Sequence, residues 1–303
     1  MLPSYELFEP KTIDEACRLK QQEGTWLVAG GTDIYVAMHG GALKPRALVD
    51  IKGIEELYEI ARHEDHWFFG ALTPHRYFEE SQDFWRDYTA LAEGCSQVGS
   101  VQIRQRGTIG GNICNAVPSA DSVGPLLVFD ADCVIVSPGG EREVPLAEFI
   151  TGPKKTVLGD DEILKGVKVY IPAEHTGSCY IKYTRRKAMD LALCGASVLV
   201  TLDTDHRIIK ARASLTTSAP TAIRAKTAEE YLLGKSVNEA DPIEFGRLCV
   251  ESASPRTSWR SSAEFRQKVI AAISEDTCRN AVRRAQGETS AAMPKWRKEV
   301  SVR

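Results

Sequence analysis

Leu27-Val-Ala-Gly30-Gly31-Thr32-Asp33-Ile34 and, later in the chain, Thr108-Ile109-Gly110-Gly111-Asn112 are two glycine-rich stretches of similar character. Glycine lets the backbone adopt positive φ and lets a ligand approach main-chain N–H groups that a Cβ would otherwise cover. Consecutive N–H groups at a turn or helix start form a concave, positively polarised site for phosphate. We therefore expect both turns to grip one diphosphate, with Thr32, Thr108 and Asn112 adding side-chain donors.

The common nucleotide-binding signatures are absent from the sequence. Gly30-Gly31 does not fit G-x-G-x-x-G, and no G-x-x-x-x-G-K-[ST] occurs, which argues against a Rossmann fold and against a P-loop NTPase. Asp33 is expected to cap the helix that follows the first turn through its side chain. By themselves the two Gly-Gly pairs are also compatible with ordinary tight turns, because turns routinely need glycine.

The composition is that of an ordinary globular protein. The chain has 303 residues, of which 43% are hydrophobic and 26% charged, and this length predicts two or three domains. A formal charge of −3 gives no overall attraction to nucleic acid. The N-terminus lacks the pattern of a signal peptide, and no apolar run approaches the roughly 20 residues of a membrane-spanning helix, so we expect a cytoplasmic protein.

Cysteine and histidine spacing predicts no metal site. The eight cysteines include no C-x-x-C pair, although iron–sulfur and zinc sites usually take two thiolates from one tight loop. We expect the cysteines to be reduced and packed as small hydrophobic residues. His39, His63, His66 and His75 fit no metal-binding motif either.

Hydrophobic periodicity divides the chain into sections at 1–55, 56–172 and 173–286, with a flexible tail at 287–303. The elements expected in the first section are a helix over 12–21, capped by Thr12 or Asp14, and strands over 26–29 and 47–51. Those expected in the second are strands over 66–70 and 133–136, a hairpin leading to Val144, and helices over 74–78, 88–95 and 124–129. Those expected in the third are strands over 179–184, 196–202 and 208–216, followed by helices over 228–233, 242–253 and 262–285. Strands followed by helices predict an α+β unit with helices packed on a three-stranded antiparallel sheet.

The two glycine stretches, followed by Pro118-Ser-Ala-Asp121, resemble the flavoprotein subunit of molybdenum hydroxylases. That family includes bacterial xanthine dehydrogenases, nicotinate dehydrogenase, carbon monoxide dehydrogenase and 4-hydroxybenzoyl-CoA reductase. Five further stretches match it in unbroken order, and together they make the resemblance specific: Phe8-Glu-Pro-Lys-Thr-Ile-Asp-Glu-Ala16, Leu48-Val-Asp-Ile51, Gln102-Ile-Arg104, Tyr183-Thr-Arg-Arg186 and Arg260-Ser-Ser-Ala-Glu-Phe-Arg266. The resemblance is to the xanthine dehydrogenase FAD subunit foremost, within the carbon monoxide dehydrogenase flavoprotein family.

The resemblance implies an α+β protein with the FAD-binding fold of the vanillyl-alcohol-oxidase (PCMH) type, in which two α/β subdomains hold FAD and an α+β C-terminal domain follows. The FAD is expected to be non-covalent, since neither turn contains a histidine that could anchor it. The cofactor-binding residues implied by the match are Leu27, Val28, Ala29, Gly30, Gly31, Thr32, Asp33 and Ile34 around the pyrophosphate, Thr108, Ile109, Gly110, Gly111, Asn112, Asn115 and Asp121 along the rest of FAD, and Lys182 close to the flavin.

The family's reaction implies partner subunits. Substrate is hydroxylated at a molybdopterin cofactor on a large subunit, and electrons pass through [2Fe-2S] clusters on a small subunit to FAD. The flavin then passes the electrons to NAD⁺, oxygen, a quinone or a ferredoxin. We expect this chain to be the FAD-carrying subunit of such a complex and therefore an oxidoreductase component. No residue is assigned a catalytic acid–base role, because the cofactor performs the redox chemistry.

Other readings of the same residues stay open at this point. Without the resemblance, Lys182 is a solvated strand lysine, Arg185 to Lys187 form a solvated turn, and Asp121 is only the N-cap of the helix that follows it. A stand-alone FAD-dependent oxidase or reductase of the same superfamily is the alternative function. A scaffold protein that has lost FAD is a third hypothesis, and the intact glycines of both turns argue against it.

Overall fold

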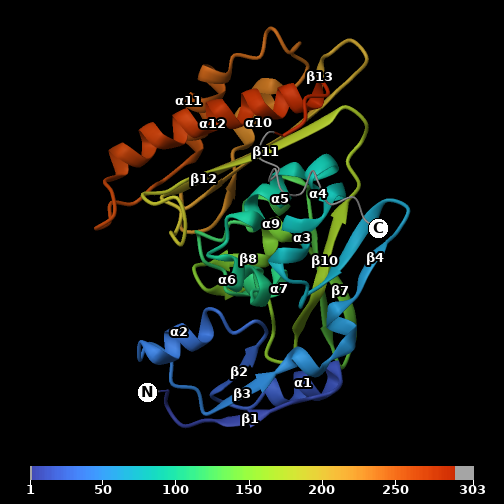
Figure 1. Ribbon diagram of the computed structural model, residues 1–303, viewed down its shortest axis with the longest axis vertical. Coiled ribbons are helices and arrows are strands. Elements are labelled where there is room, and N and C mark those ends of the chain that lie inside the picture. The colour runs from blue at the N-terminus through green and yellow to red at the C-terminus, as the bar shows by residue number, and fades with distance from the viewer. Residues whose placement is uncertain (1, 291–303) are drawn as a thin grey trace.

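The computed structural model describes residues 2–290. Its elements form three groups along the longest axis, with the N-terminal strands at one end, the C-terminal helices at the other and the middle of the chain between them (Figure 1). The part of the tail from Ala291 onward, expected to be flexible, lies outside the described residues. Within the described range no helix has both the length and the apolarity needed to cross a membrane.

The N-terminal group is a three-stranded parallel sheet of order β1-β3-β2. Its elements are β1 (Glu6–Phe8), α1 (Ile13–Lys20), β2 (Thr25–Val28), α2 (Ile34–His39), β3 (Ala47–Asp50) and two 3-10 turns, η1 (Ile51–Gly53) and η2 (Glu55–Tyr58). Helix α1 begins after Thr12, whose hydroxyl accepts a hydrogen bond from the Glu15 N–H, so Thr12 rather than Asp14 is the cap. Ile13, Ala16 and Cys17 form the buried face of α1.

The middle group contains a five-stranded sheet of order β4-β5-β10-β6-β7. The strands are β4 (Ile60–Arg62), β5 (His66–Gly70), β6 (Asp132–Ser137), β7 (Gly140–Pro145) and β10 (Ile163–Tyr170), and β8 (Ile150–Gly152) pairs separately with β9 (Lys155–Thr156). The helices are α3 (His75–Glu80), α4 (Gln82–Asp87), α5 (Thr89–Ser96), α6 (Val101–Arg106), α7 (Ile109–Cys114), α8 (Val123–Val128) and α9 (Leu146–Phe149). Edge-to-face contacts of Phe69 with Phe78 and Phe84 form the centre of this core.

The C-terminal group is an antiparallel sheet with helices, as predicted, but the sheet has four strands rather than three. Its elements are β11 (Thr176–Tyr183), β12 (Cys194–Leu202), β13 (Ile208–Thr216), β14 (Ile223–Arg224), α10 (Lys226–Leu232), α11 (Pro242–Ser252) and α12 (Ala263–Ala285). The additional strand β14 has only two residues, too few for an alternating pattern to reveal it. Every residue of β12 is buried, because α12 covers one face of the sheet and α8 packs on the other.

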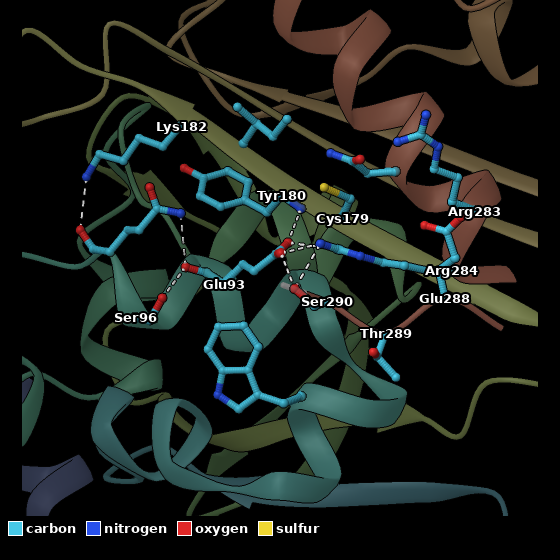
Figure 2. A pocket seen from close by; sticks show the side chains of 14 residues that line it. Glu93, Ser96, Cys179, Tyr180, Lys182, Arg283, Arg284, Glu288, Thr289 and Ser290 are labelled. Atoms are coloured by element: carbon cyan, nitrogen blue, oxygen red, sulfur yellow. Dashed lines mark hydrogen bonds and ion pairs between the residues drawn. The ribbon is translucent and has the colours of Figure 1, made fainter. Parts of the chain in front are cut away.

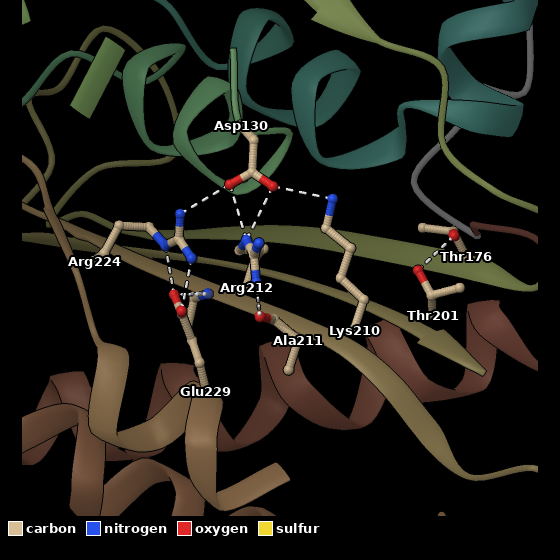
Figure 3. A network of polar contacts seen from close by, with 9 residues as sticks. Asp130, Thr176, Thr201, Lys210, Ala211, Arg212, Arg224 and Glu229 are labelled. Atoms are coloured by element: carbon tan, nitrogen blue, oxygen red, sulfur yellow. Dashed lines mark hydrogen bonds and ion pairs between the residues drawn. The ribbon is translucent and has the colours of Figure 1, made fainter. Parts of the chain in front are cut away.

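A polar cluster joins the middle and C-terminal groups where α8 ends (Figure 3). The Asp130 carboxylate accepts hydrogen bonds from Arg212 Nε at 2.8 Å and from Arg224 Nη1 at 3.0 Å, and Lys210 Nζ lies 3.0 Å away. Burial opposes ionisation of Asp130, but these cations lower its pKa below the ordinary value. The three groups of elements correspond to the units that we propose as domains, with boundaries at residues 55 and 172, and the turn η2 crosses the first of these boundaries.

Candidate functional site

The first glycine turn connects β2 to α2 and leaves a row of main-chain donors unused. Gly31 has φ +77°, a conformation that requires glycine here because a Cβ would also lie 2.6 Å from the Tyr35 ring. The N–H groups of Gly30, Gly31, Thr32 and Asp33 donate no hydrogen bond within residues 2–290. Lys52 Nζ holds the start of this turn by donating to the Ala29 carbonyl, and the same ammonium is paired with Asp50 at 2.6 Å.

The first glycine turn lies in backbone contact with Arg106 and Gly107, the two residues directly before the second glycine stretch. A Cβ placed on Gly30 would be 1.9 Å from the Arg106 carbonyl oxygen, so only glycine permits this approach. A Cβ on Gly107 would be 3.5 Å from Thr32 Oγ1, and a Cβ on Gly111 would be 3.7 Å from Ala29 Cβ. Segments far apart in the sequence therefore meet at one place, as the diphosphate hypothesis requires.

The main-chain donors of the second turn are already used, which corrects the expectation that both turns offer free amides. Ile109 N donates to the Thr73 carbonyl and Gly110 N to the Ala71 carbonyl. Gly111 N donates to Thr108 Oγ1, the N-cap of α7, and Asn112 N donates to the Thr108 carbonyl. The second turn is thus the capped start of a helix, and its contribution to a ligand comes from side chains.

Several expected site residues turn inward. Val28 and Ile109 are 1% and 0% exposed and belong to the hydrophobic core. Gly110 is needed because a Cβ there would be 2.5 Å from Ala71 Cβ, so its role is packing of α7 on the end of β5. Asp33 stands at the N-cap position of α2 but its side chain makes no capping hydrogen bond, contrary to expectation, because its backbone is already helical.

Three polar side chains expected in the site remain available to a ligand. Thr32 is half-buried beside Gly107, and its hydroxyl has no hydrogen bond within residues 2–290. Asn115, at the end of α7, is half-buried with no side-chain hydrogen bond in the same range. Asn112 Oδ1 accepts from Ser122 Oγ at 2.7 Å, which leaves the Asn112 amide N–H groups as donors.

Asp121 and Lys182 form a buried ion pair, with Nζ–Oδ2 of 2.7 Å and side chains that are 8% and 4% exposed. Tyr180 donates its hydroxyl to the other carboxylate oxygen at 2.8 Å, and Lys182 Nζ also donates to the Gln97 carbonyl. Burial raises the pKa of Asp121, and the Lys182 ammonium works against that rise. Lys182 is therefore not a solvated strand lysine, and Asp121 is not a helix cap: Ser122 occupies that position.

Tyr180 was missed by sequence reasoning although a signal was available. Alternate residues of a strand point to the same face, so Tyr180 and Lys182 on β11 share one face of the sheet. Lys52 was missed too, and its role depends on a carbonyl 23 residues away in the sequence, which no local pattern shows.

His75 lies beneath the second turn as a neutral side chain. The backbone N–H of His75 donates to the Gly107 carbonyl, and burial, with a smaller effect of Arg104, lowers the pKa of the imidazole to about 4. His75 is 1% exposed, so its ring contributes to packing and does not act as an acid–base group at physiological pH.

A cavity of about 600 Å³ lies beside β11, between α5 and α12, and both Tyr180 and Lys182 line it (Figure 2). Glu93 faces it: the carboxylate accepts from Arg284 Nη2 at 2.6 Å and from the Tyr180 N–H at 2.7 Å. Lys182 borders this cavity, but none of the residues of the two glycine turns does. The two glycine turns and this cavity are therefore separate places in the described part of the chain.

Comparisons with known proteins agree with this geometry. The family described as "FAD binding domain in molybdopterin dehydrogenase" matches residues 3–174, and "CO dehydrogenase flavoprotein C-terminal domain" matches residues 179–285. The chain belongs to this flavoprotein family. The predicted recognition and the predicted FAD-binding fold with a C-terminal domain are confirmed, and so is FAD as the family's cofactor.

Relatives of this flavoprotein are subunits of dehydrogenases. The xanthine dehydrogenase FAD-binding subunit of Escherichia coli O157:H7 is 36% identical, over 86% of this chain and 90% of that protein. The carbon monoxide dehydrogenase medium chain of Hydrogenophaga pseudoflava is 30% identical, over 87% and 92%. A solved structure of carbon monoxide dehydrogenase from Hydrogenophaga pseudoflava has a TM-score of 0.89 at 29% identity, covering 94% of this chain and 99% of that one. The flavoprotein is accordingly an oxidoreductase subunit.

Proposed function

We propose that this flavoprotein is the FAD-carrying electron-transfer subunit of a xanthine dehydrogenase-like molybdenum hydroxylase. In this proposal it receives electrons from the [2Fe-2S] clusters of a small companion subunit and delivers them to NAD⁺ or another acceptor, while a large companion subunit holds molybdopterin. Support comes from the relatives, which are named as FAD-binding subunits or medium chains of dehydrogenases and match along most of their length.

The observation on which the proposal depends most is the row of N–H groups from Gly30 to Asp33 that donate to no acceptor in the described part of the chain. A main-chain donor without a partner is costly in a folded protein unless water or a ligand accepts from it. Four consecutive donors at a turn suit the oxygens of a diphosphate, which accept several hydrogen bonds at once. The first turn also contacts Arg106 and Gly107, which come directly before α7. The polar side chains of α7 therefore lie close to these four donors.

Each proposed site residue has a distinct task. The main chain of Gly30, Gly31, Thr32 and Asp33 binds the pyrophosphate, and the Thr32 hydroxyl adds a donor. The side chains of Asn112 and Asn115, with Thr108 at the helix start, bind neighbouring parts of FAD, and the Asp121–Lys182 pair positions a cation near the flavin. Leu27, Val28, Ala29, Ile34, Ile109, Gly110 and Gly111 shape the two turns. FAD, when bound, supplies the redox chemistry.

Purification of the chain followed by a visible spectrum tests FAD binding directly. We expect the absorption bands of oxidised flavin, and mild denaturation should release FAD because no covalent link is proposed. A colourless chain that takes up no added FAD would refute the proposal.

Reconstitution tests the place of the chain in a complex. Mixed with its iron–sulfur and molybdopterin subunits, the flavoprotein should restore substrate-dependent reduction of NAD⁺, and comparison with oxygen, quinone and ferredoxin identifies the acceptor. A chain that oxidises a small substrate without any companion subunit would instead be a stand-alone FAD-dependent oxidase.

A further inference from the structure

Arg106 is an exposed arginine where the first glycine turn meets the start of the second glycine stretch. Its carbonyl oxygen would lie 1.9 Å from a Cβ on Gly30, and a Cβ on the next residue, Gly107, would lie 3.5 Å from Thr32 Oγ1. The backbone of Arg106 therefore touches the turn whose N–H groups meet no acceptor within residues 2–290. A side chain that begins here is next to any ligand held by those groups.

The guanidinium group of Arg106 makes no hydrogen bond and no ion pair in the described part of the chain. Arg104, two residues earlier on the same helix α6, is instead buried, and its Nε lies 2.7 Å from the Glu79 carboxylate. The two arginines of α6 thus differ in kind. Arg104 is used within the fold, whereas the charge of Arg106 stays available to a ligand.

Arg106 lies at the carboxyl edge of the N-terminal parallel sheet. The first glycine turn follows the end of β2, and Asp50 ends the neighbouring strand β3. Burial raises the pKa of Tyr35 and of Tyr58, and Arg106 opposes both rises, as a cation close to the two hydroxyls does. Tyr35 itself lies against the turn, since a Cβ on Gly31 would be 2.6 Å from its ring. Ligands of parallel sheets bind outside the carboxyl ends of the strands, so Arg106 is on the side where a ligand binds.

The acidic groups near the first turn make a cation necessary if a diphosphate binds there. Asp33 is exposed on the turn itself and has no ion-pair partner among the residues that the structure describes. Lys52 is already neutralised by Asp50 at 2.6 Å. A diphosphate adds further negative charge, and main-chain N–H groups offer only partial positive charges. A guanidinium compensates such charge well, because its planar fork donates two parallel hydrogen bonds to phosphate oxygens.

We propose that Arg106 is the cation that binds the FAD diphosphate, with its guanidinium donating to phosphate oxygens that the Gly30–Asp33 amides leave free. This inference rests on the proposed function, which places the diphosphate at the first turn. It adds a charged side chain to a site otherwise built from main-chain amides and neutral side chains, and it makes FAD retention dependent on ionic strength.

Titration of the apoprotein with FAD, followed by flavin fluorescence, measures the contribution of Arg106. Arg106→Gln removes the charge and should weaken FAD binding by about 10- to 100-fold, the loss expected for hydrogen bonds to a charged group. Arg106→Lys should recover part of that loss, because it restores the charge without the planar fork. Wild-type affinity should fall as salt is raised, and the fall should be less steep in Arg106→Gln. ADP, which carries the diphosphate without the flavin, should compete less well with FAD in Arg106→Gln than in the wild type.

Arg18→Gln is the matched control. Arg18 is exposed near the end of α1 and has no ion pair within residues 2–290. Helix α1 leads to the start of β2, at the edge of the sheet opposite to the first turn. This variant removes the same charge and should bind FAD and respond to salt as the wild type does. Circular dichroism should be unchanged in all three variants, since the substituted side chains are exposed and the backbone contact of Arg106 with Gly30 is retained.

The outcomes separate the inference from the proposed function. FAD affinity within about two-fold of wild type in folded Arg106→Gln would overturn the inference and leave the proposed function standing. Equal losses in Arg106→Gln and Arg18→Gln would overturn it as well, since the effect would then come from net charge alone. A wild-type chain that takes up no FAD would instead refute the proposed function itself.

Discussion

Gly30→Ala is the most direct test of the contact between the two glycine turns. The new Cβ would lie 1.9 Å from the Arg106 carbonyl oxygen, 2.7 Å from the Arg106 carbonyl carbon and 3.0 Å from Gly107 Cα. These are backbone atoms, which cannot rotate away as a side chain can. The turns must therefore separate by about 1 Å or more to restore ordinary van der Waals contact.

Two costs follow from that separation. Overpacking of this kind destabilises a protein by about 1–3 kcal/mol. Displaced donors also lose hydrogen bonds to phosphate, and each hydrogen bond to a charged group contributes about 1.5–3 kcal/mol. Loss of a single such bond from the first turn is enough to weaken FAD binding by about 10- to 100-fold.

Quenching of flavin fluorescence on titration of the apoprotein with FAD measures this loss, and circular dichroism shows whether the variant is folded. Gly152→Ala is a suitable control, because a Cβ there meets only the Lys155 side chain at 3.9 Å. If folded Gly30→Ala binds FAD within about two-fold of wild type, the turns do not form the diphosphate site and the reasoning is refuted.

Three further outcomes are expected. Asp121→Asn leaves the Lys182 ammonium buried without a counter-charge, so the free energy of unfolding measured with urea should fall by about 3–5 kcal/mol. Adding Lys182→Met should restore part of this loss, and a fall of less than about 1 kcal/mol in the Asp121→Asn variant would contradict the pairing. The hydrogen bond from Arg142 lowers the pKa of Glu162 to about 2 from an ordinary 4.5, so this carboxylate stabilises the fold above pH 4.5 and the contribution disappears as the pH falls toward 2. Glu162→Gln should therefore flatten the dependence of the urea midpoint on pH in that window, and parallel curves would rule out the contribution. Burial raises the pKa of every cysteine thiol, so a thiol reagent at pH 8 should react slowly with the native protein and label all eight after unfolding; rapid labelling of the native chain would count against the packing.

The sequence was sufficient for the place of the two turns and for the main strands and helices of the C-terminal group, but it did not predict the eight-residue strand β10 at the centre of the middle sheet. Strand and helix periods predicted β12, β13 and α12 within two residues of their ends, because long buried elements have strong patterns. The two-residue strand β14 and the capped helix α7 inside the glycine stretch were not predicted, since each is too short for a period to be read.

What the sequence determined by itself is where glycine removes a steric barrier, as at Gly30 and Gly111, and which family shares that ordered pattern. Only the tertiary structure decided which amides remain free. Two donors of the second turn are satisfied by the Ala71 and Thr73 carbonyls from another segment and two by Thr108, whereas those of the first turn meet no acceptor within residues 2–290. Whether a backbone N–H is available depends on the atoms packed around it, and those atoms come from parts of the chain that local sequence does not connect.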